Sequence, residues 1–131
     1  MRFEANILDI KTCKSVSFIS FASQNLRLSC INLQNPKSLK IGSKVFLGFK
    51  SADVLLCKDL IPLLSSNKIK VRLLSKNSSQ IITALGLQAL ECRNLYFEAL
   101  IENDSAKKLA LNDEIYAYIS YTSLFIDEIL C

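Results

Sequence analysis

The feature that most constrains the fold is an internal repeat. Residues 39–56 ("LKIGSKVFLGFKSADVLL"), shifted by 70 positions, align with residues 109–126 ("LALNDEIYAYISYTSLFI"). Half of the aligned positions are apolar in both copies, although the residues themselves are almost all different. Each copy has the same order of strand, polar break and strand. This order, present twice, predicts a duplicated structural unit.

The rest of the chain is dominated by apolar residues at alternating positions. Such segments include "SVSFISF" (15–21) and "LRLSC" (26–30) in the first half, and "KIKVRLL" (68–74) and "NLYFEALI" (94–101) in the second. Alternation with β-branched and aromatic residues is typical of half-buried strands. The chain is therefore expected to be all-β, a barrel or a sandwich of short strands.

Helix is expected only as one short turn in each half. Residues 35–42 ("NPKSLKIG") begin with a favourable N-cap and a proline and end at a glycine. In the second half, Asn103 or Asp104 can cap a turn whose apolar side consists of Ala106 and Leu109. Both turns precede a predicted strand.

Several kinds of enzyme site are disfavoured by composition. The chain has no histidine, the commonest general base, and its five cysteines form no CxxC pair. No acid–base pair, activated nucleophile or glycine-rich cofactor loop is recognisable. Scattered cysteines without metal-ligand spacing are typical of buried thiols in a reducing compartment. We therefore expect a non-enzymatic protein without a metal-ion site.

Location and charge give weaker constraints. No apolar run approaches the roughly 18 residues of a membrane span, and acidic residues interrupt the N-terminus where a signal peptide has its apolar core. The expectation is a cytoplasmic protein without membrane contact. The net charge of +4 favours an anionic partner, but the lysines do not cluster as they do in nucleic-acid patches.

Each half resembles the Mop (molbindin) domain of the TOBE group, a small five-stranded OB-like barrel. The resemblance rests on residues 39–56 and on "ALIENDSAKKLALNDEIYAYISYTSLFI" (99–126), which are similar to the family's helical turn, its G-D-x-V-like step and its K-A-T-S-V-like strand break. It covers nearly all of the chain and implies two tandem OB-like barrels, over residues 1–60 and 64–131. Residues 57–66 would connect them.

The resemblance also implies a ligand. The family binds molybdate or tungstate in the cytoplasm, generally at interfaces between barrels of an oligomer. A tetrahedral dianion only accepts hydrogen bonds, so its site must consist of donors: amides, hydroxyls and a lysine. The residues that the resemblance assigns to this site are Lys50, Ser51 and Ala52 in the first break, Thr122 and Ser123 in the second, and Asn6, Ser66 and Asn67 in the first strands of the two halves.

The sequence departs from the family pattern at several of these places. Asp53 stands at a hydroxyl position of the first break, where a carboxylate would repel an anion. Ser120 replaces the lysine in the second break. Asn6 and Asn67 are both matched to the family's first-strand asparagine, with Ala5 and Ser66 where an arginine is expected.

Each candidate residue also has an ordinary structural explanation. Lys50 could be a solvated lysine at a strand end, and the two asparagines could hydrogen-bond turns. Thr122 and Ser123 could satisfy local backbone groups. Aromatic residues of the predicted strands, such as Phe49 and Tyr118, are expected to pack in the core or an interface and not to stack on bases.

The leading hypothesis is a homo-oligomeric molybdate- or tungstate-binding protein for storage, homeostasis or delivery, working with molybdenum transport or cofactor-synthesis proteins. One alternative is a regulatory or oligomerisation TOBE module that acts through a transporter or a transcription regulator. Another is an OB-fold nucleic-acid binder, which would need exposed aromatic residues interleaved with basic ones.

Overall fold

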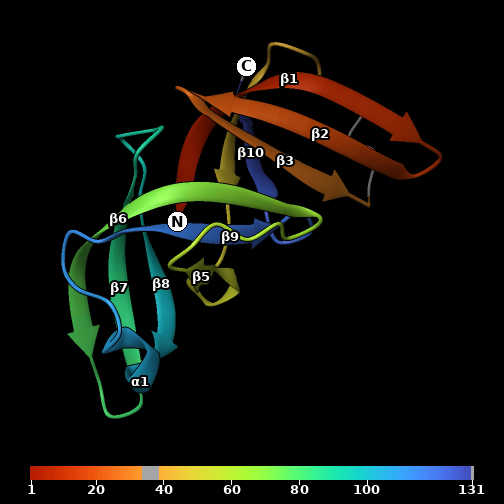
Figure 1. Ribbon diagram of the computed structural model, residues 1–131. Coiled ribbons are helices and arrows are strands. Elements are labelled where there is room, and N and C mark those ends of the chain that lie inside the picture. Colours follow the sequence, from red (N-terminus) through yellow and green to blue (C-terminus); the bar gives the residue numbers. More distant parts are fainter. Residues whose placement is uncertain (34–38, 131) are drawn as a thin grey trace.

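The protein consists almost entirely of β-structure. The computed structural model describes residues 1–33 and 39–130, with two five-stranded antiparallel sheets in the orders β10-β4-β1-β2-β3 and β5-β9-β6-β7-β8 (Figure 1). The prediction of an all-β, OB-like fold is confirmed. The elements are β1 (Arg2–Cys13), β2 (Val16–Ser23), β3 (Leu26–Asn32), β4 (Lys44–Gly48), η1 (Ser51–Asp53), β5 (Leu55–Cys57), β6 (Ser66–Ser78), β7 (Ile82–Ala89), β8 (Tyr96–Glu102), α1 (Asn103–Ala106), β9 (Glu114–Ser120) and β10 (Phe125–Leu130).

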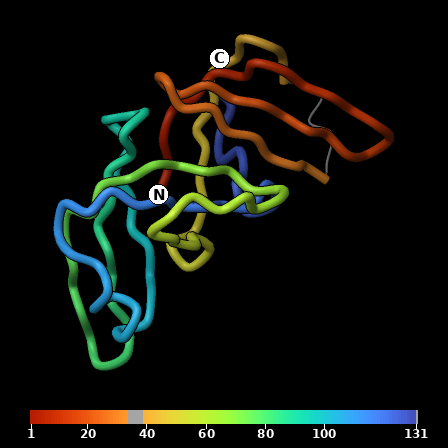
Figure 2. Tube along the Cα trace, in the orientation of Figure 1, coloured from red at the N-terminus to blue at the C-terminus, as the bar shows by residue number. Residues whose placement is uncertain are grey.

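The two halves exchange their last strands. β5, from the first half, pairs with β9, while the C-terminal strand β10 returns to pair with β4. Figure 2 shows this return as the blue end of the trace running beside the yellow β4. Each sheet therefore contains four strands from one half and one from the other. The division into barrels over residues 1–60 and 64–131 stays a prediction. Each hydrogen-bonded sheet contains strands from both of these ranges.

The repeat is visible in the hydrogen bonds that join each first strand to the turn before the fourth. The amide of Gly42 donates to the Ile7 carbonyl at 2.8 Å, and the amide of Asn112 donates to the Leu73 carbonyl at 2.7 Å. Gly42 and Asn112 both have a positive φ, of 89° and 71°. The 70-residue offset thus holds for residues 39–56 and 109–126, which occupy equivalent places.

The first strands of the two halves follow a different offset from the one that we expected. Asn6 lies opposite Lys44, and Arg72 lies opposite Glu114. A bulge follows Ile7 in β1 and Leu73 in β6, so equivalent residues differ by 66 positions. The alignment of Asn6 with Asn67 is therefore wrong, because it matched two identical letters and ignored the buried alternation.

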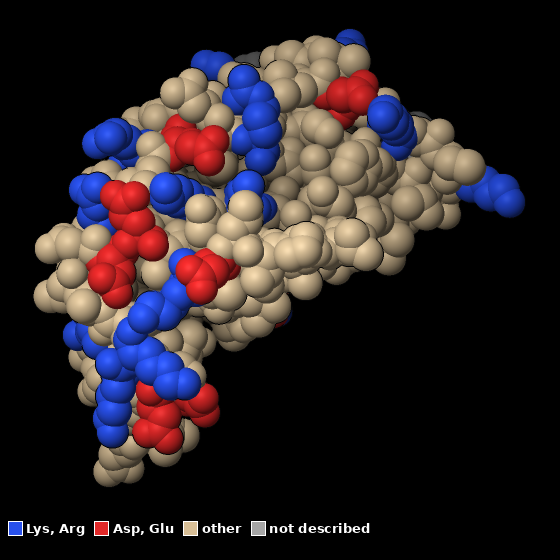
Figure 3. Space-filling view, in the orientation of Figure 1, with Lys and Arg blue, Asp and Glu red and all other residues tan. Residues whose placement is uncertain are grey.

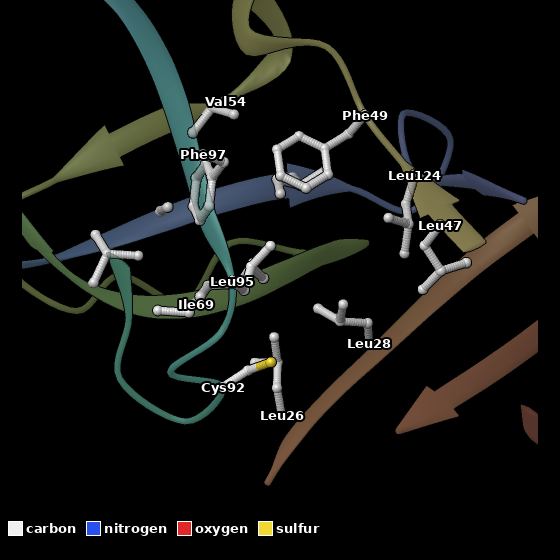
Figure 4. Packing of buried hydrophobic residues seen from close by; sticks show 14 of the residues in the cluster. Leu26, Leu28, Leu47, Phe49, Val54, Ile69, Cys92, Leu95, Phe97 and Leu124 are labelled. Carbon is white, nitrogen blue, oxygen red and sulfur yellow. The ribbon is translucent and has the colours of Figure 1, made fainter. Parts of the chain in front are cut away.

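One apolar core extends across both halves. Phe49, which follows β4, and Phe97, in β8, pack edge to face with ring centroids 5.2 Å apart (Figure 4). Around them lie Leu28 of the first half and Leu124 of the second, both buried. Since Phe49, Phe97 and Tyr118 are all buried, the expectation that aromatic residues pack inside holds for these three.

The short helix α1 confirms the turn predicted in the second half, with Ala106 and Leu109 buried. The predicted cap is wrong, because the N-cap position is Glu102 and no side chain caps the helix there. Its first residue, Asn103, accepts a hydrogen bond from the Thr83 hydroxyl at 2.7 Å and donates to the Ser79 carbonyl at 3.1 Å. The turn predicted over residues 35–42 lies partly outside the described residues. No helix within residues 1–33 and 39–130 is long and apolar enough to cross a membrane.

Candidate functional site

The first break, residues 50–53, is held between two buried side chains. Phe49 and Val54, on either side of it, are each 3% exposed and anchor the chain in the core. Between them the chain forms the single 3₁₀ turn η1, with Lys50 in extended conformation before it. This arrangement leaves the polar side chains of the break on the surface, because both flanking residues point inward.

The first break presents several hydrogen-bond donors that have no acceptor among the described residues. The Asp53 amide donates to the Lys50 carbonyl at 3.0 Å and the Val54 amide to the Ser51 carbonyl at 3.5 Å. The amides of Ser51 and Ala52 and the Lys50 ammonium donate to no acceptor in the part of the chain that the structure describes. An ammonium and two amides together resemble the donor set of an anion nest.

The second break, residues 120–123, uses its donors internally. The Tyr121 amide donates to the Ser65 carbonyl at 3.0 Å, and the Thr122 amide to the Ser120 hydroxyl oxygen at 3.2 Å. The Ser123 amide donates to the Ser120 carbonyl at 3.0 Å. The Ser120 and Thr122 hydroxyls lie 3.0 Å apart and also bond to each other. An anion arriving here would have to displace these bonds.

An aromatic pair also closes the second break. The rings of Phe18 and Tyr121 meet edge to face, with centroids 5.4 Å apart, and the Tyr121 carbonyl accepts a hydrogen bond from the Ile31 amide at 2.8 Å. By the offsets of the repeat, the residues in the equivalent places at the first break are Ala84 and Ser51. Their small side chains leave the first break open. The two breaks therefore follow the same backbone path but differ in which hydrogen-bond donors are available.

Asn67 and Ser66 lie on the side of the second break. Asn67 is buried, and its carboxamide oxygen accepts a hydrogen bond from the Ser29 amide at 2.7 Å. Its nitrogen donates to the carbonyls of Ser29, at 2.9 Å, and Ile119, at 3.2 Å. Asn67 thus joins β6 to β3 and has no free polar group to offer, while Ser66 pairs with Ser120 in the β6–β9 ladder.

Asn6 lies far from the first break. It faces Lys44, whereas Arg2 faces Gly48 near the far end of β4. Four residues of antiparallel strand span about 14 Å, so Asn6 and Lys50 are separated by more than that within one chain. The structure brings together Lys50, Ser51 and Ala52, and separately Ser66, Asn67, Thr122 and Ser123. Asn6 belongs to neither group.

Comparisons with known proteins bear on the fold. No family model matches the chain, and no curated protein matches it in sequence. Among solved structures, the chain is similar to ModG, a cytoplasmic molybdate-binding protein whose crystal structure contains molybdate. The TM-score is 0.87 at 14% sequence identity, and the match covers 96% of this chain and 94% of that one. The fold is that of ModG.

The similarity to ModG confirms the molbindin-like fold that the sequence resemblance implied. With 96% of this chain covered, the match extends over both halves of the repeat. ModG is described as a molybdate-binding protein. No group of three or more Cys, Asp or Glu side chains that could hold a bare metal ion occurs within the described ranges.

Sequence reasoning missed the closure of the second break. The pairing of Tyr121 with Phe18 depends on β3 lying beside the second half, which no local pattern reveals. The correct register of the first strand did have a signal. Aligning Phe3, Ala5 and Ile7 with Ile69, Val71 and Leu73 matches apolar residues throughout, as the 66-residue offset requires.

Proposed function

We propose that this protein binds a tetrahedral oxyanion of the molybdate class, without catalysis, and that the first break is its principal site. The observation that carries the proposal is the set of unused donors at Lys50, Ser51 and Ala52, in a fold shared with a molybdate-binding protein. The Lys50 ammonium would supply positive charge, and the amides of Ser51 and Ala52 would orient the anion. The Ser51 hydroxyl would add a further donor.

The second break makes a poorer site in this proposal. Thr122 and Ser123 keep their hydroxyls, but their backbone amides are already bonded and no lysine is present. Ser66 and Asn67 lie beside it, with the Asn67 carboxamide fully used. We therefore expect one strong site per chain, although the fold repeats.

Isothermal titration calorimetry with molybdate tests the proposal. A charge-assisted hydrogen bond contributes about 1.5–3 kcal/mol, so Lys50→Ala should weaken molybdate binding by roughly ten- to a hundredfold at low salt. Thermal stability should hardly change, because Lys50 is exposed. Titration with tungstate tests whether the site distinguishes between the two ions.

Lys40→Ala is the matched control, because it removes the same charge from an exposed lysine just before β4. It should leave the affinity within about twofold. Equal losses for Lys50→Ala and Lys40→Ala would mean that only the overall charge attracts the anion. A wild-type protein that binds neither molybdate nor tungstate would refute the proposal and favour a module that acts through a protein partner.

For the wider role, we propose cytoplasmic storage or delivery of the anion by a homo-oligomer. The oligomer is supported by apolar side chains on the connection between the halves, where Leu60 is 55% exposed and Leu64 is 87% exposed. Sedimentation velocity at micromolar concentration should give a dimer or a trimer. A strict monomer would contradict this part of the proposal and leave the anion site to be judged by calorimetry.

A nucleic-acid-binding function receives less support. Figure 3 shows lysine and arginine side chains with acidic residues beside them over this face of the molecule. Phe46, an aromatic residue of β4, is covered by the Arg2 guanidinium, whose carbon lies 3.9 Å from the ring centroid. Single-stranded binding needs exposed rings beside basic residues.

A further inference from the structure

A polar cavity lies away from both breaks, at the junction of the two halves. It has a volume of about 420 Å³ and lies where the start of β1 and the end of β2 meet the loop before β8. The β1–β2 ladder begins only at Asn6, opposite Ala22, so the first residues of β1 have no strand neighbour on this side. The exposed polar side chains of its wall are Arg2, Glu4, Asn6, Gln24, Lys44 and Asn94. Ser23, also in the wall, is buried and donates to the Glu4 carbonyl at 2.7 Å.

The charges of this cavity are incompletely paired. Arg2 is engaged, with its Nε 3.3 Å from a carboxylate oxygen of Asp127 and a further ion pair to Glu128. Lys44 and Glu4 form no ion pair within residues 1–33 and 39–130. The cavity therefore offers a cation and a carboxylate that are separate from each other.

The charged side chains at the equivalent positions of the second half are paired with each other. There the positions of Glu4, Asn6 and Lys44 are occupied by Lys70, Arg72 and Glu114. A Glu114 carboxylate oxygen lies 2.8 Å from an Arg72 guanidinium nitrogen, and the other lies 3.7 Å from the Lys70 ammonium. The hydrogen bond from Arg72, together with the charges of both cations, lowers the pKa of Glu114. One half satisfies these positions with its own side chains, and the other leaves them open.

We propose that the open cavity binds a small organic carboxylate that carries a neighbouring hydroxyl or ammonium group. Its carboxylate would accept a hydrogen bond from the Lys44 ammonium, and its hydroxyl or ammonium would donate to Glu4. The carboxamides of Asn6 and Asn94, each both donor and acceptor, would bind the remaining polar atoms. The Gln24 nitrogen could donate as well, while its oxygen accepts a hydrogen bond from the Arg93 amide at 3.1 Å. A tetrahedral oxyanion fits these groups less well, because it has no donor for the Glu4 carboxylate and is repelled by it.

The test uses three compounds of one size: L-lactate, L-alanine and L-lactamide, which is the neutral amide of lactate. Each is titrated into the ¹⁵N-labelled full chain, with the side-chain amide resonances of Asn6 and Asn94 as the readout. Saturable shifts with lactate or alanine, and none with lactamide, are expected. Lactate alone would identify a hydroxy acid, and alanine alone or in addition would identify an amino acid as a ligand. No shifts with either acid, or equal shifts with lactamide, would overturn the proposal.

Variants separate this cavity from the first break. Lys44→Gln should weaken binding of the acid at least roughly tenfold, while Lys11→Gln, an exposed lysine further along β1, should leave it unchanged. The double variant Asn6→Arg with Lys44→Glu introduces into the first half the pair that Arg72 and Glu114 form in the second. It should therefore abolish binding of the acid while the protein stays folded. Persistent binding in Lys44→Gln would overturn the proposal.

The proposal on molybdate can fail or hold independently of this one. Lys50→Ala should keep the lactate or alanine shifts at Asn6 and Asn94, and Lys44→Gln should keep the affinity for molybdate. Loss of the acid in Lys50→Ala would place it at the first break and overturn the assignment of this cavity.

Discussion

Replacement of Asn67 by alanine should separate a structural asparagine from a ligand-binding one. The side chain is 5% exposed and makes three hydrogen bonds, one from the Ser29 amide and two to the carbonyls of Ser29 and Ile119. An unsatisfied buried polar group costs about 1–3 kcal/mol. Ser29 is only half buried, so water can reach part of the gap. We therefore expect Asn67→Ala to lower the free energy of unfolding by about 2–4 kcal/mol, a large fraction of an ordinary domain's stability.

Equilibrium urea unfolding with linear extrapolation measures this loss. Asn6→Ala is the matched control, because Asn6 is exposed and its loss should cost less than about 0.5 kcal/mol. Asn67→Asp keeps the acceptor for the Ser29 amide and loses both donor bonds. It should therefore be destabilised as well, and more so above the pKa of the new carboxyl group.

Molybdate affinity completes the comparison for Asn67. Because the carboxamide is fully used inside the fold, affinity at the first break should stay within about twofold in Asn67→Ala, measured where the variant is folded. Unchanged stability combined with a tenfold loss of molybdate affinity would refute the structural role and restore Asn67 as a ligand residue.

Three further predictions concern the break and the core. Asp53→Ser should strengthen molybdate binding by several fold at low salt, because repulsion between a carboxylate and a dianion about 7 Å apart in water is about 1 kcal/mol. Calorimetry at two salt concentrations measures the gain in affinity and its screening by salt. An unchanged affinity would mean that the anion binds elsewhere. Burial raises the pKa of the Cys30 thiol from 9.0 to about 11, so stability should fall as pH rises through this interval. In the same native protein, iodoacetamide should alkylate the exposed Cys13 much faster than Cys30, and equal rates would contradict the buried environment. Phe49→Ala should cost about 3–5 kcal/mol, and urea unfolding should still show a single transition, whereas two separate transitions would mean that the halves fold independently.

The sequence predicted those parts of the fold that depend on local alternation. The 70-residue offset between residues 39–56 and 109–126 is correct because buried positions, such as Val45 and Ile115, recur in a strand that is followed by a break. The first-strand alignment is wrong because it matched the two asparagines, Asn6 and Asn67, and not the buried apolar residues around them. In an alternating strand, which positions are buried is a better guide to register than a single polar identity.

The state of the candidate sites could not be predicted in the same way. Whether an amide in a break is free depends on which distant carbonyl lies beside it. At the second break that carbonyl belongs to Ser65, directly before β6, and the Tyr121 amide donates to it. The equivalent Ser51 amide at the first break donates to no acceptor within residues 1–33 and 39–130. Equivalent positions of the two breaks therefore differ in their polar chemistry.

The exchange of β5 and β10 explains why this difference does not open the fold. Each break leads directly into the strand that crosses to the other sheet, so the chain at both breaks is fixed by Val54 and Leu124, which are buried in the shared core. The backbone path of a break is therefore set by packing, and its polar groups contribute little to holding it. Free donors can then remain at the first break without cost to the fold, since they stay in contact with water. This separation of packing from polar chemistry allows one copy of the repeat to be closed while the other remains available for a ligand.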